Sequence, residues 1–217
     1  MAKLDYLSVK GFLSIGEIDK LLIGPVNVLV GANGSGKSNF IQSFEFLRSV
    51  RNGALQQYTA TRGGAEKMLF FGSKTTKTIE FEVSFSDSTN GYKVKFAPTD
   101  DDKLSIKSEI CWYWDKAYPS PLERLLTPKG SEAAISQQSG TEIGKYVRRH
   151  LESWRVYHFH DTSFSSPMKK TADINDNRFY RPDGSNIAPY LYLLKKTNSH
   201  AYSHICSTIR KIAPFFR

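Results

Sequence analysis

The chain has 217 residues, of which 40% are hydrophobic and 13% aromatic, and this composition excludes an intrinsically disordered protein. Its net charge of +9 favours an anionic partner, of which nucleic acid is the commonest. No apolar run approaches ~20 residues and no secretion signal opens the chain, so we expect a cytoplasmic protein with no membrane-spanning segment.

The N-terminal third predicts three strands and a helix. Residues 4–9 alternate loosely between apolar and polar side chains, and residues 15–24 look like a short partner strand. The compact apolar run from Val26 to Val30 predicts a strand that is buried on both faces. After a glycine-rich stretch, apolar side chains share one face of a predicted helix at Phe40, Ile41, Phe44 and Leu47.

The middle of the chain predicts an antiparallel β-meander. Residues 77–85 alternate strictly, and the pair Asn90-Gly91 that follows is a hairpin-turn signal. Residues 92–96 alternate again, and residues 104–114 are a third candidate strand. Residues 118–130 are interrupted by prolines and are interpreted as a connector.

The C-terminal part predicts mainly helices. Apolar spacing predicts a helix over 141–154 and two closing helices over 187–196 and 201–212, the first capped by Ser185 or Asn186. Residues 155–161 look like a strand, and a long polar stretch follows them. We therefore expect a core with the meander insertion at 1–165, which contains the glycine-rich stretch, and a linker with the start of a helical lobe at 166–217. The cysteines Cys111 and Cys206 are expected to be free thiols.

Residues 31–38 match the phosphate-binding P-loop pattern, Gly-x-x-x-x-Gly-Lys-Ser. Its glycines let successive backbone N–H groups turn toward phosphate oxygens, and the following helix directs its positive dipole end at the same anion. Lys37 would place a positive charge on the β- and γ-phosphates of ATP, and Ser38 would offer a hydroxyl ligand to Mg²⁺. With Lys37 also the expected catalytic residue, the residues expected to bind ATP are Gly31, Asn33, Gly34, Ser35, Gly36, Lys37, Ser38 and Asn39.

The loop and the corner before it resemble the ATPase heads of the RecF, SMC and OLD proteins. The loop reads GANGSGKSN at 31–39, and the corner is Phe12-Leu13-Ser14-Ile15, where many family members have arginine in place of Leu13. The resemblance implies an α/β P-loop NTPase of the ABC-ATPase-head type with an antiparallel β-meander insertion and an incomplete C-terminal helical lobe. Further blocks resemble a bacterial branch of ATPases labelled AAA-family, at 157–163, 176–194 and 209–216.

Two motifs of that family have no full counterpart in the chain. A Walker B strand would end in Asp-Glu, and the nearest imitation ends at Asp161, which could instead approach Mg²⁺ or its water together with His160. A His-x-His metal site at His158 and His160 is an alternative, although it has no third ligand. The pair Ser139-Gly140 mimics a signature loop but comes too early, so we interpret it as a helix cap. We therefore expect the chain to stop inside the helical lobe and to hydrolyse ATP inefficiently alone.

Three functions remain open from the sequence. The resemblance implies an ATP-driven switch in DNA repair or anti-phage defence, with self-associating heads, DNA and a nuclease or other effector as partners. A small-molecule phosphotransferase is an alternative, with Arg178 and Arg181 on a lid, and so is a non-catalytic nucleotide-sensing module. The basic residues are scattered, with no run of five or more, so solvated helix faces stand as the alternative to a DNA-facing stripe.

Overall fold

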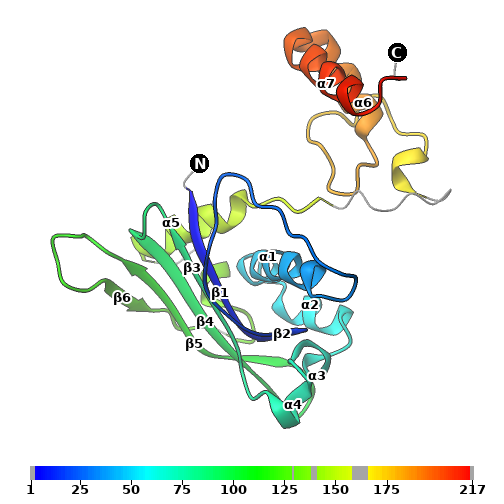
Figure 1. Cartoon of the computed structure of the whole chain (residues 1–217). Helices are drawn as coiled ribbons and strands as arrows, with labels where there is room; N and C mark the ends of the chain where they lie inside the picture. Colours follow the sequence, from blue (N-terminus) through cyan, green and yellow to red (C-terminus); the bar gives the residue numbers. More distant parts are fainter. Residues whose placement is uncertain (1–2, 129, 138–140, 158–165, 216–217) are drawn as a thin grey trace. The chain divides into compact units, whose positions relative to one another are not determined.

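The computed structural model describes residues 3–128, 130–137, 141–157 and 166–215 (Figure 1). The chain forms two compact units, Met1–Trp154 and Arg155–Arg217. This division comes earlier in the chain than the boundary at residue 165 that the sequence suggested. Each unit is described by itself.

The first unit is built on a six-stranded sheet in which every neighbouring pair is antiparallel. Its strand order is β2-β1-β3-β4-β5-β6. The predicted meander is confirmed. The prediction of a connector at residues 118–130 is wrong in part, because residues 122–125 form a strand that pairs with the end of β5. The strands are β1 (Leu4–Phe12), β2 (Ile15–Leu22), β3 (Ile79–Phe85), β4 (Asn90–Pro98), β5 (Leu104–Tyr113) and β6 (Leu122–Leu125).

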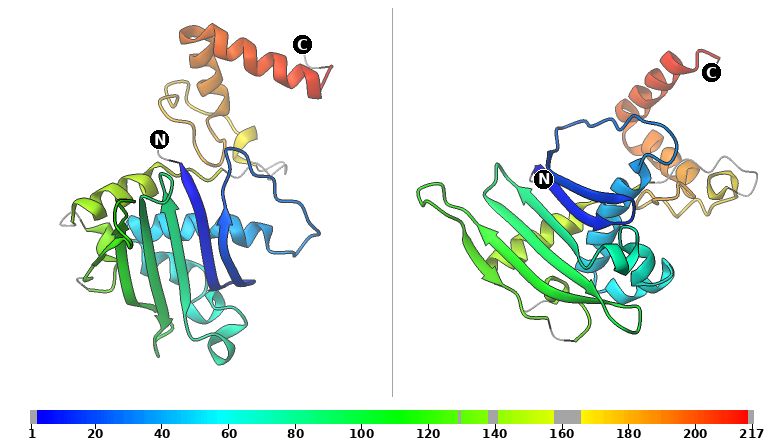
Figure 2. Two further views of the ribbon diagram at one scale, coloured as in Figure 1. Left: turned by 60° about the vertical axis from the view of Figure 1, so that its left-hand side comes forward. Right: turned by 60° about the horizontal axis from the view of Figure 1, so that its bottom comes forward.

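Helices gather on one face of this sheet, as Figure 2 shows. The predicted helices after the glycine-rich loop and at 141–154 are confirmed. The helical elements of this unit are α1 (Lys37–Arg51), α2 (Leu55–Thr61), α3 (Ala65–Met68), α4 (Gly72–Thr75), the 3₁₀ turn η1 (Ala134–Ser136) and α5 (Glu142–Ser153).

The core between helices and sheet is centred on Phe46 of α1, whose side chain is fully buried. Its ring centroid lies 5.3 Å from that of Phe12, 5.3 Å from Phe81 and 5.2 Å from Phe96, so one helical residue contacts strands β1, β3 and β4. Alternation along β3 brings Phe81, Val83 and Phe85 to this side of the sheet. The packing fixes the axis of α1, and with it the position of the loop that precedes α1.

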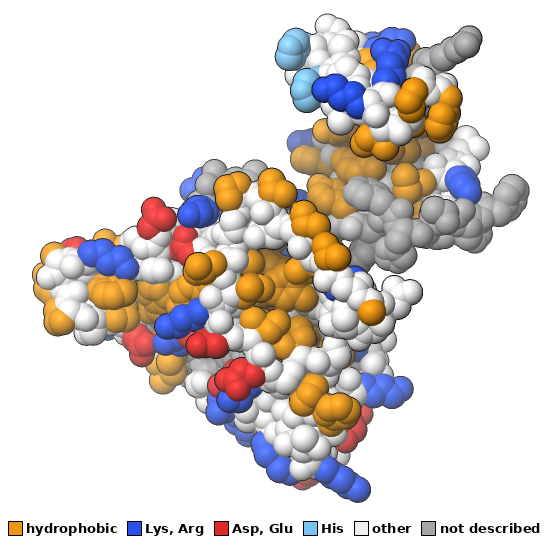
Figure 3. All heavy atoms as spheres, in the orientation of Figure 1, with side chains coloured by type: hydrophobic (Ala, Val, Ile, Leu, Met, Phe, Trp, Pro, Cys, Tyr) orange, Lys and Arg blue, Asp and Glu red, His pale blue; other side chains and the backbone are white. Residues whose placement is uncertain are grey.

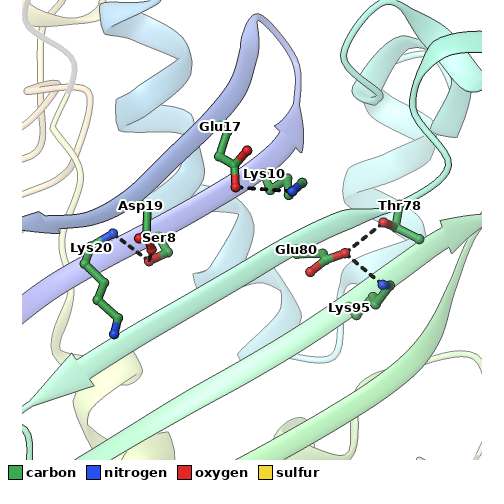
Figure 4. A network of polar contacts seen from close by, with 8 residues as sticks. All are labelled: Ser8, Lys10, Glu17, Asp19, Lys20, Thr78, Glu80 and Lys95. Carbon is green, nitrogen blue, oxygen red and sulfur yellow. Dashed lines mark hydrogen bonds and ion pairs between the residues drawn. The ribbon is translucent and has the colours of Figure 1, made fainter.

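The opposite face of the sheet is polar, and several of its charges are paired (Figure 4). Lys95 on β4 lies 2.8 Å from the carboxylate of Glu80 on β3, and Lys10 on β1 lies 3.2 Å from Glu17 on β2. Cross-strand pairs of opposite charge stabilise neighbouring strands modestly. The lysines of this face are therefore largely neutralised by acidic neighbours.

The expected buried strand from Val26 to Val30 is wrong. Residues 23–36 form neither helix nor strand, and Val26, Val28 and Val30 are 82%, 77% and 89% exposed. A strand buried on both faces needs pairing neighbours, and no described residue forms a backbone hydrogen bond with residues 26–30. Figure 3 shows hydrophobic side chains at the surface along this segment, which Figure 1 draws between β2 and α1.

The hairpin turn expected at Asn90-Gly91 lies instead at residues 86–89. Ser86 and Ser88 both have left-handed backbone angles, with φ of 58° and 55°, and the carboxylate of Asp5 accepts the N–H of Ser88 at 2.7 Å. Gly91 serves packing, because a Cβ there would lie 2.2 Å from the ring of Trp112 on β5. The glycine thus marks a close approach inside the sheet and no turn.

A buried carboxylate ties the segment after β6 to the sheet. Glu109 on β5 is 1% exposed and accepts the N–H groups of Ala134 and Ile135, each at 2.7 Å, and the hydroxyl of Tyr92 at 2.9 Å. Burial raises the pKa of the Glu109 carboxyl above its ordinary value, although these three donors oppose that shift. Glu109 thereby positions η1 beneath the helical layer.

The second unit contains the 3₁₀ turn η2 (Pro167–Lys169) and the helices α6 (Ile187–Thr197) and α7 (Ser199–Ile212). Asn186 stands at the start of α6, but its side chain does not cap the helix as predicted. Its fully buried amide binds the loop before the helix, accepting from the N–H of Arg181 at 2.8 Å and donating to the carbonyls of Asp176 and Phe179. None of the described helices is long and apolar enough to cross a membrane.

Both cysteines are free, as the sequence predicted. Cys111 is buried on β5, whereas Cys206 on α7 is half-buried. Burial raises the pKa of the Cys111 thiol, so this sulfur remains protonated and packs as a small apolar group.

Candidate functional site

The glycine-rich loop enters α1 through two left-handed residues. Gly34 has φ 82° and Gly36, the residue before the helix, has φ 90° and ψ 0°. Side chains disfavour this region by about 1–2 kcal/mol, so glycine is the residue suited to both positions. The N–H of Ser35 turns back to the carbonyl of Ala32 at 3.2 Å, and the N–H of Phe40 closes the first helical turn on Gly36 at 2.9 Å.

The side chain of Lys37 folds back onto the glycine-rich loop. Its Nζ donates to the carbonyls of Gly31 at 2.8 Å and Ala32 at 2.7 Å, and to the hydroxyl of Ser35 at 3.3 Å. These partners hold the ammonium over the curled backbone, and no carboxylate in the described part of the chain pairs with it. The charge is therefore available to an anion that enters the loop.

The N-terminal end of α1 is open to a ligand. No side chain caps this end and the first turn contains no acidic residue, so its N–H groups and positive dipole end are not satisfied by the described residues around them. A hollow of about 200 Å³ lies against it. The residues that line this hollow are Asn33, Gly34, Gly36, Lys37, Ser38 and Asn39.

The corner between β1 and β2 supports the loop from behind. The side-chain amide of Asn39 donates to the hydroxyl of Ser14 at 2.7 Å, and a Cβ on Gly36 would lie 3.0 Å from the same oxygen. Leu13 has φ 52° and its N–H binds the carbonyl of Met68 at 2.8 Å, which fixes the corner to α3. The sequence marked this corner by its Phe-x-Ser-Ile pattern but did not show that Ser14 contacts Asn39.

A larger hollow of about 480 Å³ extends from the loop to the corner. Gly31 and Lys37 border it on the loop side, and Ile15 and Glu17 border it on the corner side. Together the two hollows offer backbone donors, one ammonium and the exposed hydroxyl of Ser38, a set that fits a triphosphate with a hydrated Mg²⁺. The predicted residues from Gly31 to Asn39 are thus brought together at one place.

Other predicted site residues are not brought to this loop by the described structure. His158, His160 and Asp161 lie outside the described residues, as do Ser139 and Gly140, and the residue that caps α5 is Thr141, which accepts the N–H of Gly144. The described residues contain no group of three or more His, Cys, Asp or Glu that could hold a metal ion. In the second unit, Arg181 is paired with Asp176 at 2.8 Å and Arg178 lies over the ring of Phe179.

Replacing Ser14 with alanine is expected to weaken ATP binding modestly. The change removes the hydrogen-bond acceptor of Asn39 and loosens the support behind Gly36, a loss of about 0.5–1.5 kcal/mol or about 2- to 10-fold in affinity. Titration with a fluorescent ATP analogue measures it. Ser8→Ala is the matched control, since it removes a hydroxyl from the open sheet face, where Ser8 accepts the N–H of Lys20. Equal losses in both variants would contradict a supporting role for Ser14.

Comparisons with known proteins identify a family and two relatives. The family model described as "AAA domain, putative AbiEii toxin, Type IV TA system" matches residues 26–198. The DNA replication and repair protein RecF of Lacticaseibacillus casei (strain BL23) is 24% identical over 156 residues, which are 71% of this chain and 41% of that protein. The RecF protein of Lacticaseibacillus paracasei (strain ATCC 334) matches equally well. The chain therefore spans less than half of the length of the curated relatives it matches.

Proposed function

The chain belongs to this AAA-domain family and to the RecF/SMC/OLD-like ABC-type ATPases, and from this premise we propose that it forms the ATP-binding part of an ATPase of this kind. In this proposal, binding of ATP and Mg²⁺ at Gly31–Asn39 drives a conformational switch that acts on DNA, in repair or in anti-phage defence. Self-association of two such heads and an effector such as a nuclease belong to the same proposal. Both relatives are DNA replication and repair proteins, which supports the DNA-directed part of the proposal.

The observation that carries the proposal is the built loop at the start of α1. Its two left-handed glycines curl the backbone, and the Lys37 ammonium lies 2.7–2.8 Å from two loop carbonyls. This arrangement supports anion binding, because it places a positive charge beside the N-terminal end of α1. A glycine-rich turn with only a structural role would not need a lysine at its centre whose ammonium has no acidic partner among the described residues.

The chain's own residues would divide the work of binding ATP. N–H groups of the loop and of the first turn of α1 would donate to phosphate oxygens, and phosphate would replace the carbonyls as partner of the Lys37 ammonium. The Ser38 hydroxyl would be one ligand of Mg²⁺, which bridges phosphate oxygens when it is bound. The hydrogen bond from Asn39 to Ser14 would hold the loop in position.

An efficient hydrolytic cycle is expected to need a further segment beside the loop. The exposed apolar run from Val26 to Val30 adjoins a hollow of about 440 Å³ lined by Ile23, Leu29, Phe40 and Phe44. An exposed apolar surface of this kind is suited to an added strand, which could bring the carboxylates that the described loop lacks.

The test follows phosphate release and thermal stability in the same samples. Saturating Mg²⁺ and ATP at about 100 times the dissociation constant are expected to stabilise the parent chain by about 2.7 kcal/mol, with no stabilisation of Lys37→Ala. Phosphate release by the parent is expected to stay at the level of Lys37→Ala. Fast Lys37-dependent turnover would contradict the need for a further segment. Equal melting temperatures with ATP and with AMP would contradict triphosphate binding.

A further inference from the structure

Positive charge is concentrated in the second unit. Residues 155–217 contain ten lysines and arginines and four acidic residues, so this part of the chain has +6 of the total charge of +9. From Gly184 to the end of the sequence there is no aspartate or glutamate. The basic residues that follow Gly184 therefore have no acidic neighbours along the sequence.

The helices α6 and α7 form a hairpin that displays these charges. The turn is tight, because the N–H of Asn198 binds the carbonyl of Leu194 at 2.8 Å and its side chain caps α7 through the N–H of Ala201 at 3.0 Å. Pro189 is the one buried residue of these two fully described helices, so the hairpin is mostly surface. The exposed basic side chains are Lys195 and Lys196 at the end of α6, His200 and His204 on α7, and Arg210 and Lys211 in its last turn.

The lysines of the hairpin rest on aromatic rings and have no acidic partner among the described residues. The Nζ of Lys196 lies 4.3 Å from the ring centroid of Tyr192, and that of Lys195 lies 5.7 Å from the ring centroid of Tyr202. An aromatic ring orients an ammonium but leaves its net charge in place. The charges thus remain available to an anionic partner, and Figure 3 shows blue side chains and no red ones on this part of the surface.

Three lysines of the first unit's open sheet face differ in this respect. Lys10, Lys93 and Lys95 each lie within 4.0 Å of a glutamate, and Lys103 on the loop before β5 is paired with Asp101. Their charge is largely compensated locally. A polyanion therefore gains more by contacting the hairpin than by contacting this face.

We propose that the α6–α7 hairpin is the surface on which this chain docks the phosphate backbone of duplex DNA. The proposal rests on the DNA partner of the proposed function and names the surface that contacts it. Lysines and arginines without acidic neighbours bind phosphates independently of base sequence, and binding releases condensed counterions. Binding at the hairpin is therefore salt-dependent and indifferent to sequence.

The experiment compares two variants of the full chain that lose the same charge at different places. The hairpin variant has Lys195→Gln, Lys196→Gln, Arg210→Gln and Lys211→Gln, and the control variant has Lys10→Gln, Lys93→Gln, Lys95→Gln and Lys103→Gln. Fluorescence anisotropy of a labelled duplex gives the affinity and its salt dependence for each. Circular dichroism verifies that both variants are folded, and none of the eight side chains is buried.

The hairpin variant is expected to lose about tenfold or more in affinity, with a salt slope that falls by about 0.9 for each phosphate that the hairpin no longer neutralises. The control variant is expected to stay within about twofold of the parent. Equal losses in the two variants, or none in the hairpin variant, would overturn the proposal. Binding of the parent to anionic phospholipid vesicles but not to the duplex would also overturn it. All affinities are measured without ATP and Mg²⁺, so the result for the hairpin does not depend on whether the nucleotide site functions.

Discussion

Replacement of Phe46 with alanine is expected to lower the free energy of unfolding of the first unit by about 3–5 kcal/mol. The ring is fully buried and contacts aromatic rings from three strands and from α2, where Tyr58 lies 5.5 Å away. Its removal leaves a cavity that the rigid sheet cannot close. Because α1 begins at the nucleotide loop, the same change loosens the element that holds Lys37 in place.

Denaturant unfolding followed by circular dichroism measures this loss, and Phe71→Ala is the matched control. Phe71 is 78% exposed on the turn between α3 and α4, so the same deletion removes little packing. We expect it to change stability by no more than about 0.5 kcal/mol. A Phe46→Ala variant as stable as Phe71→Ala would show that α1 is not anchored to the sheet as described.

Replacement of Gly36 with alanine is expected to weaken ATP binding at least about tenfold, because the loop must leave its left-handed conformation or bear about 1–2 kcal/mol of strain. The new Cβ would also press on the Ser14 hydroxyl at 3.0 Å and displace the support of Asn39. Either response moves the N–H groups at the start of α1 away from the hollow in which phosphate would lie. Titration with ATP and Mg²⁺ measures the change.

Gly130→Ala separates backbone strain from damage to the site. Gly130 has φ 93°, nearly the same as Gly36, and no atom lies within 4 Å of a Cβ built there. We expect this variant to lose a similar amount of stability and to keep the parent's affinity for ATP. If both variants lost ATP affinity equally, the loop's shape at Gly36 would not be what binds the nucleotide.

The sequence predicted well those elements in which the spacing of apolar residues within the element itself determines the buried face. The alternation of β3 and the helical spacing of α1 each place one apolar face on the core, so the pattern and the fold agree. The run from Val26 to Val30 failed because a strand buried on both faces depends on neighbours that the described residues do not supply. The prediction of a turn at Asn90-Gly91 failed because the ring of Trp112, which is distant in the sequence, requires a glycine there. The spacing of residues in the sequence cannot reveal this contact.

The sequence predicted where the candidate site lies in the chain, but not how its side chains are arranged in space. The spacing of Gly31, Gly36 and Lys37 was sufficient to predict an anion site at this loop, because each residue type has one physical task in such a motif. The direction of the Lys37 side chain and the hydrogen bond from Asn39 to Ser14 depend on how the β1–β2 corner folds against α1. The expectations for Asp161, His158 and His160 fall outside the described residues and stay predictions.

The most direct test of the central claim, that the Gly31–Asn39 loop holds ATP with Mg²⁺, is calorimetric titration of the purified chain and of Lys37→Ala. Lys37 is half-exposed and its ammonium contacts loop carbonyls and one hydroxyl, so the variant should keep its fold. We predict saturable heat from the parent chain and none from the variant. Equal heat from both proteins, or no heat from a folded parent chain, would contradict the claim.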